Sequence, residues 1–216
     1  MNIKKITTLG VLCSLAVIAN LVVSFPIIPA VAFLRYDPKD IIIVIGGFIY
    51  GPLSAMVMSL ITSFIEVLYR NAGGNILIDI LMNVISTCSL ACIAAYYYKK
   101  HHDRKGAIKG LLIGAAVSIL AMCLWNYIVT PIYYGMPRSV VAAMILPGIL
   151  PFNLIKNGIN VVIVIYLYKP IVNLLRRNNL ANIDGEGKMS TAFLLFGAFA
   201  LLTIVLLFLV HYGIIK

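Results

Sequence analysis

Three ionisable side chains lie deep inside apolar stretches of this sequence, where a charge is expensive. They are Glu66, Asp79 and Lys156. By default such a residue faces the protein interior, pairs with another polar group and marks a binding or transport site. The chemistry open to one ammonium and two carboxylates at this depth is the binding of a polar molecule or the neutralisation of each other's charge.

The lysine belongs to a polar stripe. Four residues follow the spacing i, i+3, i+4, i+7 and so share one face of a helix: Asn153, Lys156, Asn157 and Asn160. Pro151 is compatible with the first turn of that helix. Amide groups and an ammonium opposite a carboxylate could hold a polar, partly planar molecule. The alternative is that Lys156 pairs with Glu66 or Asp79 and only holds the helices together.

The composition indicates that these residues sit in a membrane. Hydrophobic residues make up 62% of the chain and charged residues 11%, with a mean hydropathy of +1.03. A soluble domain could not cover its surface with so few charges, so lipid must be the solvent. The net charge of +10 could suggest nucleic acid. However, the basic residues cluster between apolar runs, which is typical of cytoplasmic loops of membrane proteins.

A span of about 20 apolar residues crosses a bilayer. The candidates are 6–25, 75–98, 106–129, 148–168 and 190–212, together with a longer block at 41–69. Gly51-Pro52 is a natural turn, so we split the block into helices over 39–50 and 53–70. This split puts most Lys and Arg residues on the side of the N-terminus, as the positive-inside rule requires.

The sequence therefore predicts an all-α polytopic membrane protein with seven spans. The N-terminus is expected in the cytoplasm and the C-terminus outside. Residues 1–178 form a six-helix domain, 179–189 a cytoplasmic linker and 190–212 an additional transmembrane helix. On this topology Glu66, Asp79 and Lys156 lie roughly 6 to 12 Å below the outer surface, and Asn126 lies near the outer end of its span. All four converge in the outer half of the bilayer.

Two outer segments could cover such a site. Residues 33–40, with Tyr36 and Asp37, could fold over it as a lid, or could be an ordinary entry into the helix that follows Asp37-Pro38. Residues 128–147 include Tyr133 and Tyr134 and could form a roof, although aromatic residues at an interface are often belt anchors.

Two other groups could suggest metal binding. Cys88 and Cys92 are one helical turn apart, which could suit a metal or a disulfide, but no His or carboxylate is nearby in the sequence, which favours packing. The run His101-His102-Asp103 lies in a basic loop and is interpreted as a solvated charge run. We therefore expect no metal.

Several motifs together resemble one family. They are Tyr-Asp-Pro-Lys-Asp (36–40), Ile-Gly-Gly-Phe-Ile-Tyr-Gly-Pro (45–52), Leu-Trp-Asn-Tyr-Ile-Val-Thr-Pro (124–131), Leu-Pro-Phe-Asn-Leu-Ile-Lys (150–156) and Leu-Tyr-Lys-Pro (167–170). Their order resembles that of the riboflavin-specific substrate-binding subunits, or S-components, of energy-coupling factor (ECF) transporters, over about residues 4–178. The resemblance implies a six-helix protein that binds its vitamin from outside. It also implies docking on a transmembrane coupling protein with two cytoplasmic ATPases.

The resemblance also implies roles for particular residues. Asn126, Asn153 and Lys156 match positions that hydrogen-bond the polar edge of the isoalloxazine ring. Tyr36 and Asp37 match the outer loop that closes the site, and Glu66 matches a polar position on the third helix. Gly10 and Ser14 match a small-residue face that contacts the coupling protein, although ordinary packing explains that spacing equally well. The span at 190–212 is outside the family pattern.

We therefore expect a riboflavin-binding subunit that performs no chemistry, with riboflavin as transported ligand and no cofactor. The same fold tuned to another flavin or vitamin is the near alternative. An intramembrane enzyme is disfavoured because the sequence offers no nucleophile with its base, no metal cluster and no closely spaced acidic pair. The sequence has no P-loop, so ATP hydrolysis by that route is not expected. A solitary channel or facilitator is also disfavoured.

Overall fold

The computed structural model describes residues 3–70 and 75–177, and over these ranges the chain forms a helical bundle. The elements are α1 (Ile3–Val22), β1 (Phe25–Pro26), η1 (Pro29–Val31), β2 (Arg35–Tyr36), α2 (Lys39–Tyr50), α3 (Pro52–Arg70), α4 (Ile76–Lys100), α5 (Arg104–Tyr134), α6 (Arg138–Met144), η2 (Ile145–Ile149) and α7 (Leu150–Arg177). The predicted linker at 179–189 and helix at 190–212 lie outside the described residues.

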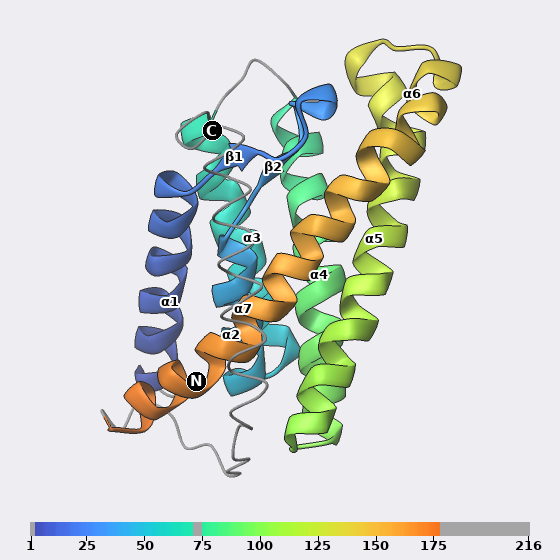
Figure 1. The fold of residues 1–216 in the computed structure, drawn as a ribbon. Helices are drawn as coiled ribbons and strands as arrows, with labels where there is room; N and C mark the ends of the chain where they lie inside the picture. The colour runs from blue at the N-terminus through green and yellow to red at the C-terminus, as the bar shows by residue number, and fades with distance from the viewer. Residues whose placement is uncertain (1–2, 71–74, 178–216) are drawn as a thin grey trace, which may run out of the picture.

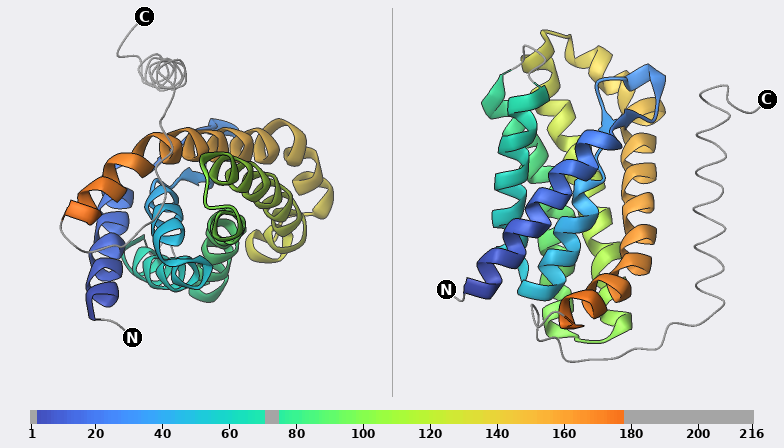
Figure 2. Two further views of the ribbon diagram at one scale, coloured as in Figure 1. Left: turned by 90° about the horizontal axis from the view of Figure 1, so that it is seen from below. Right: turned by 90° about the vertical axis from the view of Figure 1, so that its left-hand side faces the viewer.

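The long helices run up and down between two ends of the bundle (Figures 1 and 2). The lower end in Figure 1 holds the start of α1, the α2–α3 turn and the α4–α5 turn. The upper end holds the β1–β2 hairpin and α6. The hairpin is antiparallel, with Phe25 opposite Tyr36 and Pro26 opposite Arg35.

The predicted break between the second and third helices is confirmed. The second helix ends at Tyr50 and the third begins at Pro52. Gly51 has φ +88°, a conformation that favours glycine, and its N–H donates to the carbonyl of Gly47. Pro52 occupies the first position of α3, where a missing N–H costs nothing.

Two helices extend further than the sequence predicted. The helix α5 continues past residue 129, through Pro131, and ends at Tyr134 before Gly135 with φ +64°. The span expected at 148–168 begins at Arg138, since α6 and a five-residue π-helical turn lead directly into α7. Both differences lengthen the helices at the end of the bundle that holds α6, and Tyr133 and Tyr134 therefore belong to a helix.

Five segments of the described residues are long and apolar enough to cross a membrane: α1, α3, α4, α5 and Arg138–Ile171. The helix α2 is not among them, because its 12 residues cover only about 18 Å. It packs against α1, α3, α4 and α7, and nine of its residues are buried. The extended β2 leads down into it (Figure 1), so the start of α2 lies inside the bundle and not at the membrane surface.

Two apolar clusters hold the bundle together. The larger one centres on α2 and includes Ile43, Val44 and Ile45. The smaller one joins η1 to η2 and the start of α7, through Val31, Ile149 and Phe152. Between these clusters lies a polar region.

Candidate functional site

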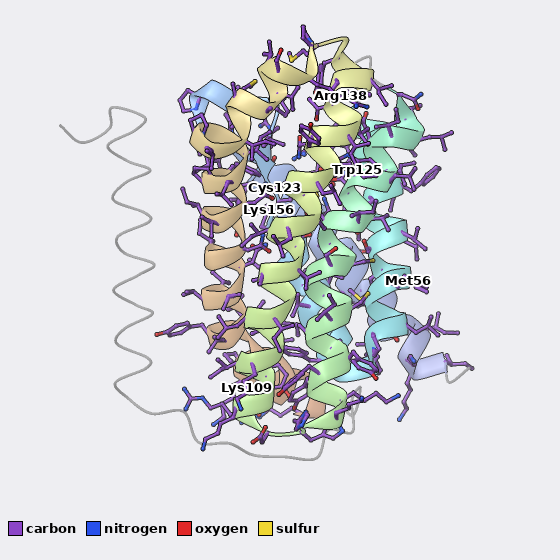
Figure 3. The ribbon with its side chains drawn as sticks, turned by 90° about the vertical axis from the view of Figure 1, so that its right-hand side faces the viewer. Met56, Lys109, Cys123, Trp125, Arg138 and Lys156 are labelled. Atoms are coloured by element: carbon purple, nitrogen blue, oxygen red, sulfur yellow. The ribbon has the colours of Figure 1, made fainter. Side chains whose placement is uncertain are left out.

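The stripe predicted on the last described helix faces the interior. Asn153, Lys156, Asn157 and Asn160 on α7 are all buried, with at most 5% of each residue exposed. Figure 3 shows Lys156 between Lys109, near the lower end of α5, and Arg138, at the upper end of the bundle. The helical spacing thus predicted the orientation of these four side chains.

The lysine pairs with carboxylates, but not with the two that the sequence suggested as its partners. Its Nζ lies 3.4 Å from Oδ2 of Asp37 and 3.2 Å from Oδ2 of Asp40. Neither Glu66 nor Asp79 forms an ion pair with Lys156 among the described residues. The expected partners were wrong because Asp37 and Asp40 enter the bundle with α2.

A second buried lysine completes the arrangement. Lys39 is 1% exposed and contacts both Glu66 and Asp37, the latter at 3.7 Å. Arg70, one turn after Glu66 on α3, pairs with Glu66 and lies 3.2 Å from Asp37. We call the three acids and three bases the ion cluster: Asp37, Lys39, Asp40, Glu66, Arg70 and Lys156. Its formal charges cancel, as buried charges require.

Sequence reasoning missed Lys39 and Asp40, which it assigned to the outer entry of a helix. The available signal was the helix itself. The residues after Asp40 are apolar on every side, and a helix that is hydrophobic all round is buried. The first turn of such a helix is buried with it, so its charges need partners.

Neutral side chains fix the ion cluster from behind. The hydroxyl of Thr87 on α4 donates to Asp40 Oδ1 at 2.6 Å, and the amide of Asn160 donates to Asp40 Oδ2 at 3.4 Å. Tyr36 in turn donates to Asn160 Oδ1 at 3.1 Å. Burial alone would raise the pKa of Asp37, but Lys39, Lys156 and Arg70 overcome it and lower that pKa to about 2.

A cavity of about 390 Å³ adjoins the ion cluster. Small-molecule sites usually measure about 300–1,000 Å³, so its size suits a small-molecule ligand. Its polar wall includes Asp37, Glu66, Asp79, Asn83, Asn153 and Lys156. Its flat apolar surfaces come from Phe33, Tyr133, Tyr134 and Phe152. Phe33 and Tyr134 meet with ring centroids 5.5 Å apart, which connects the segment before β2 to the end of α5.

The remaining predicted residues lie behind the cavity wall. Asn157 donates to the carbonyl of Asn153, while Tyr36 and Asn160 support Asp40. Asn126 is 1% exposed, donates to the carbonyl of Met122 and accepts from Thr130. It lies on the same face of α5 as two lining residues, Met122 and Tyr133, at spacings of four and seven.

The small residues of α1 face outward. Gly10 and Ser14 are exposed, and a side chain at Gly10 would meet no atom within 4 Å. The Ser14 hydroxyl donates to the carbonyl of Gly10, so it leaves a smooth surface. Their spacing therefore does not serve packing within the described part of this chain.

These observations define a class: a multi-pass helical membrane protein with a small-molecule cavity near one end of its bundle. Residues 4–168 match the family described as ECF transporter, substrate-specific component. The chain belongs to this family of membrane-embedded transporter subunits.

Characterised relatives agree with that assignment. The riboflavin transporter RibU of Staphylococcus aureus is 26% identical over 180 residues, covering 81% of this chain and 93% of the relative. The riboflavin transporter FmnP of Bacillus subtilis is 28% identical over 174 residues, covering 77% and 90%. A solved S component of a bacterial ECF transporter is 27% identical, with a TM-score of 0.68, and covers 80% of this chain and 97% of that structure.

Proposed function

We propose that this protein is the substrate-binding subunit of an ECF-type importer, that it captures riboflavin from outside the cell, and that it performs no chemistry itself. The observation that carries the proposal is the cavity, which combines flat aromatic walls with buried amide and ammonium donors. A planar ring system with a polar edge fits such a lining, since aromatic faces stack on it and donors reach its carbonyl and ring-nitrogen acceptors.

Lys156 and Asn153 are the donors to the ring edge in this proposal. Asn126 supports this wall from behind, on the same face of α5 as the lining residues Met122 and Tyr133. Asp37 closes the site from the segment before α2, and Glu66 holds Lys39 and Arg70 in place beside it. Tyr36, Asn157 and Asn160 position this lining from behind.

The cavity opens to the outside in this proposal. The end of the bundle that holds Lys4, Lys5, Lys99, Lys100 and Arg104 is the basic one, and basic ends face the cytoplasm. The N-terminus is then cytoplasmic, and the cavity lies in the outer half. A span at 190–212 would leave the C-terminus outside. For transport the protein docks on a transmembrane coupling protein with two ATPases, and Gly10 and Ser14 form part of that contact.

The test is titration of the purified full chain with riboflavin, followed by quenching of flavin fluorescence. We expect saturable binding at one site per protein. Lys156→Met, which keeps the length of the side chain, should weaken binding at least tenfold because the buried donor is lost. Unaltered fluorescence at all concentrations would refute riboflavin as the ligand and leave another vitamin as the alternative.

Substitutions at a matched pair of asparagines distinguish an effect on ligand binding from an effect on folding. Asn153 and Asn157 are each 2% exposed and each donate to the carbonyl four residues earlier, at 2.8 and 2.9 Å. Only Asn153 lines the cavity. Asn153→Ala should therefore weaken binding at least tenfold, and Asn157→Ala less than threefold, with equal thermal stability. Equal losses of affinity would move the site away from this wall.

A further inference from the structure

One carboxylate that lines the cavity pairs with no cation of the described residues. The ion cluster pairs each of its three acids with Lys39, Arg70 or Lys156, and its charges cancel. Asp79 also lines the cavity but forms no ion pair with any described residue. Its Oδ2 accepts a hydrogen bond from the hydroxyl of Tyr133 at 3.0 Å. The carboxylate of Asp79 therefore faces the cavity, and no cation of the described residues compensates its charge.

Asp79 lies at the outer part of the cavity. It is in the first turn of α4, and Tyr133 is the penultimate residue of α5. Ser86, the deepest lining residue of α4, is seven residues further and accepts from Lys156 at 3.4 Å. At about 1.5 Å per residue this separation is roughly 10 Å along α4. A flavin whose ring edge meets Lys156 thus extends its side chain toward Asp79.

The cations of the cavity are engaged elsewhere. Arg70 and Lys156 are held by carboxylates of the ion cluster, although Nη2 of Arg70 has no hydrogen-bond partner among the described residues. Arg35 is exposed, and its guanidinium donates to the side chain and carbonyl of Ser24, with the carbonyl bond at 2.7 Å. Water and salt screen an exposed charge of this kind. An anionic group entering the outer cavity therefore meets the carboxylate of Asp79, while every buried cation beside it is already balanced by an acid of the ion cluster.

We propose that Asp79 determines substrate specificity by accepting hydrogen bonds from the hydroxylated chain of a neutral flavin and by repelling the phosphate of a flavin mononucleotide. This inference rests on the proposed function. Hydroxyl groups can donate to Asp79, whereas a phosphate dianion has no proton to donate and carries the same sign of charge. The site thus selects riboflavin over its 5′-phosphate by rejection as well as attraction.

The test compares the dissociation constants of riboflavin and flavin mononucleotide for the purified full chain and for Asp79→Asn. We expect wild-type protein to prefer riboflavin at least tenfold. The substitution should reduce that preference at least tenfold, because the amide removes the repulsion. Lumiflavin, which has the ring without the hydroxylated chain, should bind both proteins within a factor of two. The wild-type preference should also shrink between 10 mM and 500 mM NaCl.

Two further variants test whether the charge of Asp79 causes the preference for riboflavin. Tyr133→Phe removes the hydrogen bond to Asp79 but keeps the carboxylate, so the preference for riboflavin should persist. Arg35→Gln should alter it less than threefold. The inference is overturned if Asp79→Asn retains the wild-type preference while binding riboflavin, or if Arg35→Gln has the larger effect. Wild-type protein that binds no riboflavin would instead refute the proposed function on which the inference rests.

Discussion

Lys156 has two roles at the scale of single residues. It balances Asp37 and Asp40, and its side chain also reaches the wall of the cavity. The two interpretations raised by the sequence, a ligand donor and a structural ion pair, are therefore compatible in one residue. The contacts of 3.4 and 3.2 Å are long for charged hydrogen bonds, so the ammonium can also donate to a ligand.

Lys39 has a structural role only: it balances the charge of buried carboxylates. Substituting Lys39 tests how much this balance contributes to stability. Lys39→Met leaves Glu66 and Asp37 buried with one cation fewer between them. Breaking a buried ion pair from one side costs about 3–5 kcal/mol, so the unfolding temperature of the ligand-free protein should fall clearly. Thermal unfolding in detergent measures this loss.

The double variant Lys39→Met/Glu66→Gln is the control. It removes one charge of each sign, so the ion cluster is again balanced. We expect the double variant to be more stable than Lys39→Met alone. A single variant as stable as the wild type would show that the charge of Lys39 is not needed to neutralise the ion cluster.

At the scale of elements, local patterns were predictable from the sequence. The Gly51-Pro52 break and the buried stripe of α7 follow from turn chemistry and helical spacing. The ion cluster could not be predicted from local patterns, because its contacts join residues far apart in the chain. The Lys156–Asp37 contact, for example, links α7 to the segment before α2 across 119 positions. The depth at which α2 begins depends on that packing, and no local pattern encodes it.

The contact between α4 and α5 gives a prediction at the same scale. A Cβ added at Gly114 would lie 2.5 Å from the carbonyl oxygen of Leu90, which is backbone and cannot rotate away. Gly114→Ala should therefore push the helices apart and cost about 1–3 kcal/mol, in spite of the higher helix propensity of alanine. A lower unfolding temperature would be the readout.

Gly158 on α7 is the matched control, because a Cβ there would meet nothing within 4 Å. Gly158→Ala should leave the unfolding temperature unchanged or raise it slightly through helix propensity. If the two alanine variants unfold at the same temperature, the close approach of α4 and α5 does not limit stability.

At the scale of the whole molecule, the proposed function assigns ligand binding and docking on the coupling protein to different surfaces. The cavity lies near one end of the bundle, whereas Gly10 and Ser14 lie on the exposed face of α1. A change on that face can alter docking without touching the ion cluster or the cavity wall. The two activities should therefore be separable by substitution.

Gly10→Leu tests this separation. No described atom lies within 4 Å of the added Cβ, so the fold and the affinity for riboflavin should remain within a factor of two of the wild type. Uptake by cells that contain the ATPase module should fall at least tenfold, because a bulky side chain keeps a partner helix from close approach. Gly158→Leu, a matched change in open space on α7, should leave both binding and uptake intact. Full uptake by the Gly10→Leu variant would mean that the coupling protein contacts a different face of the bundle.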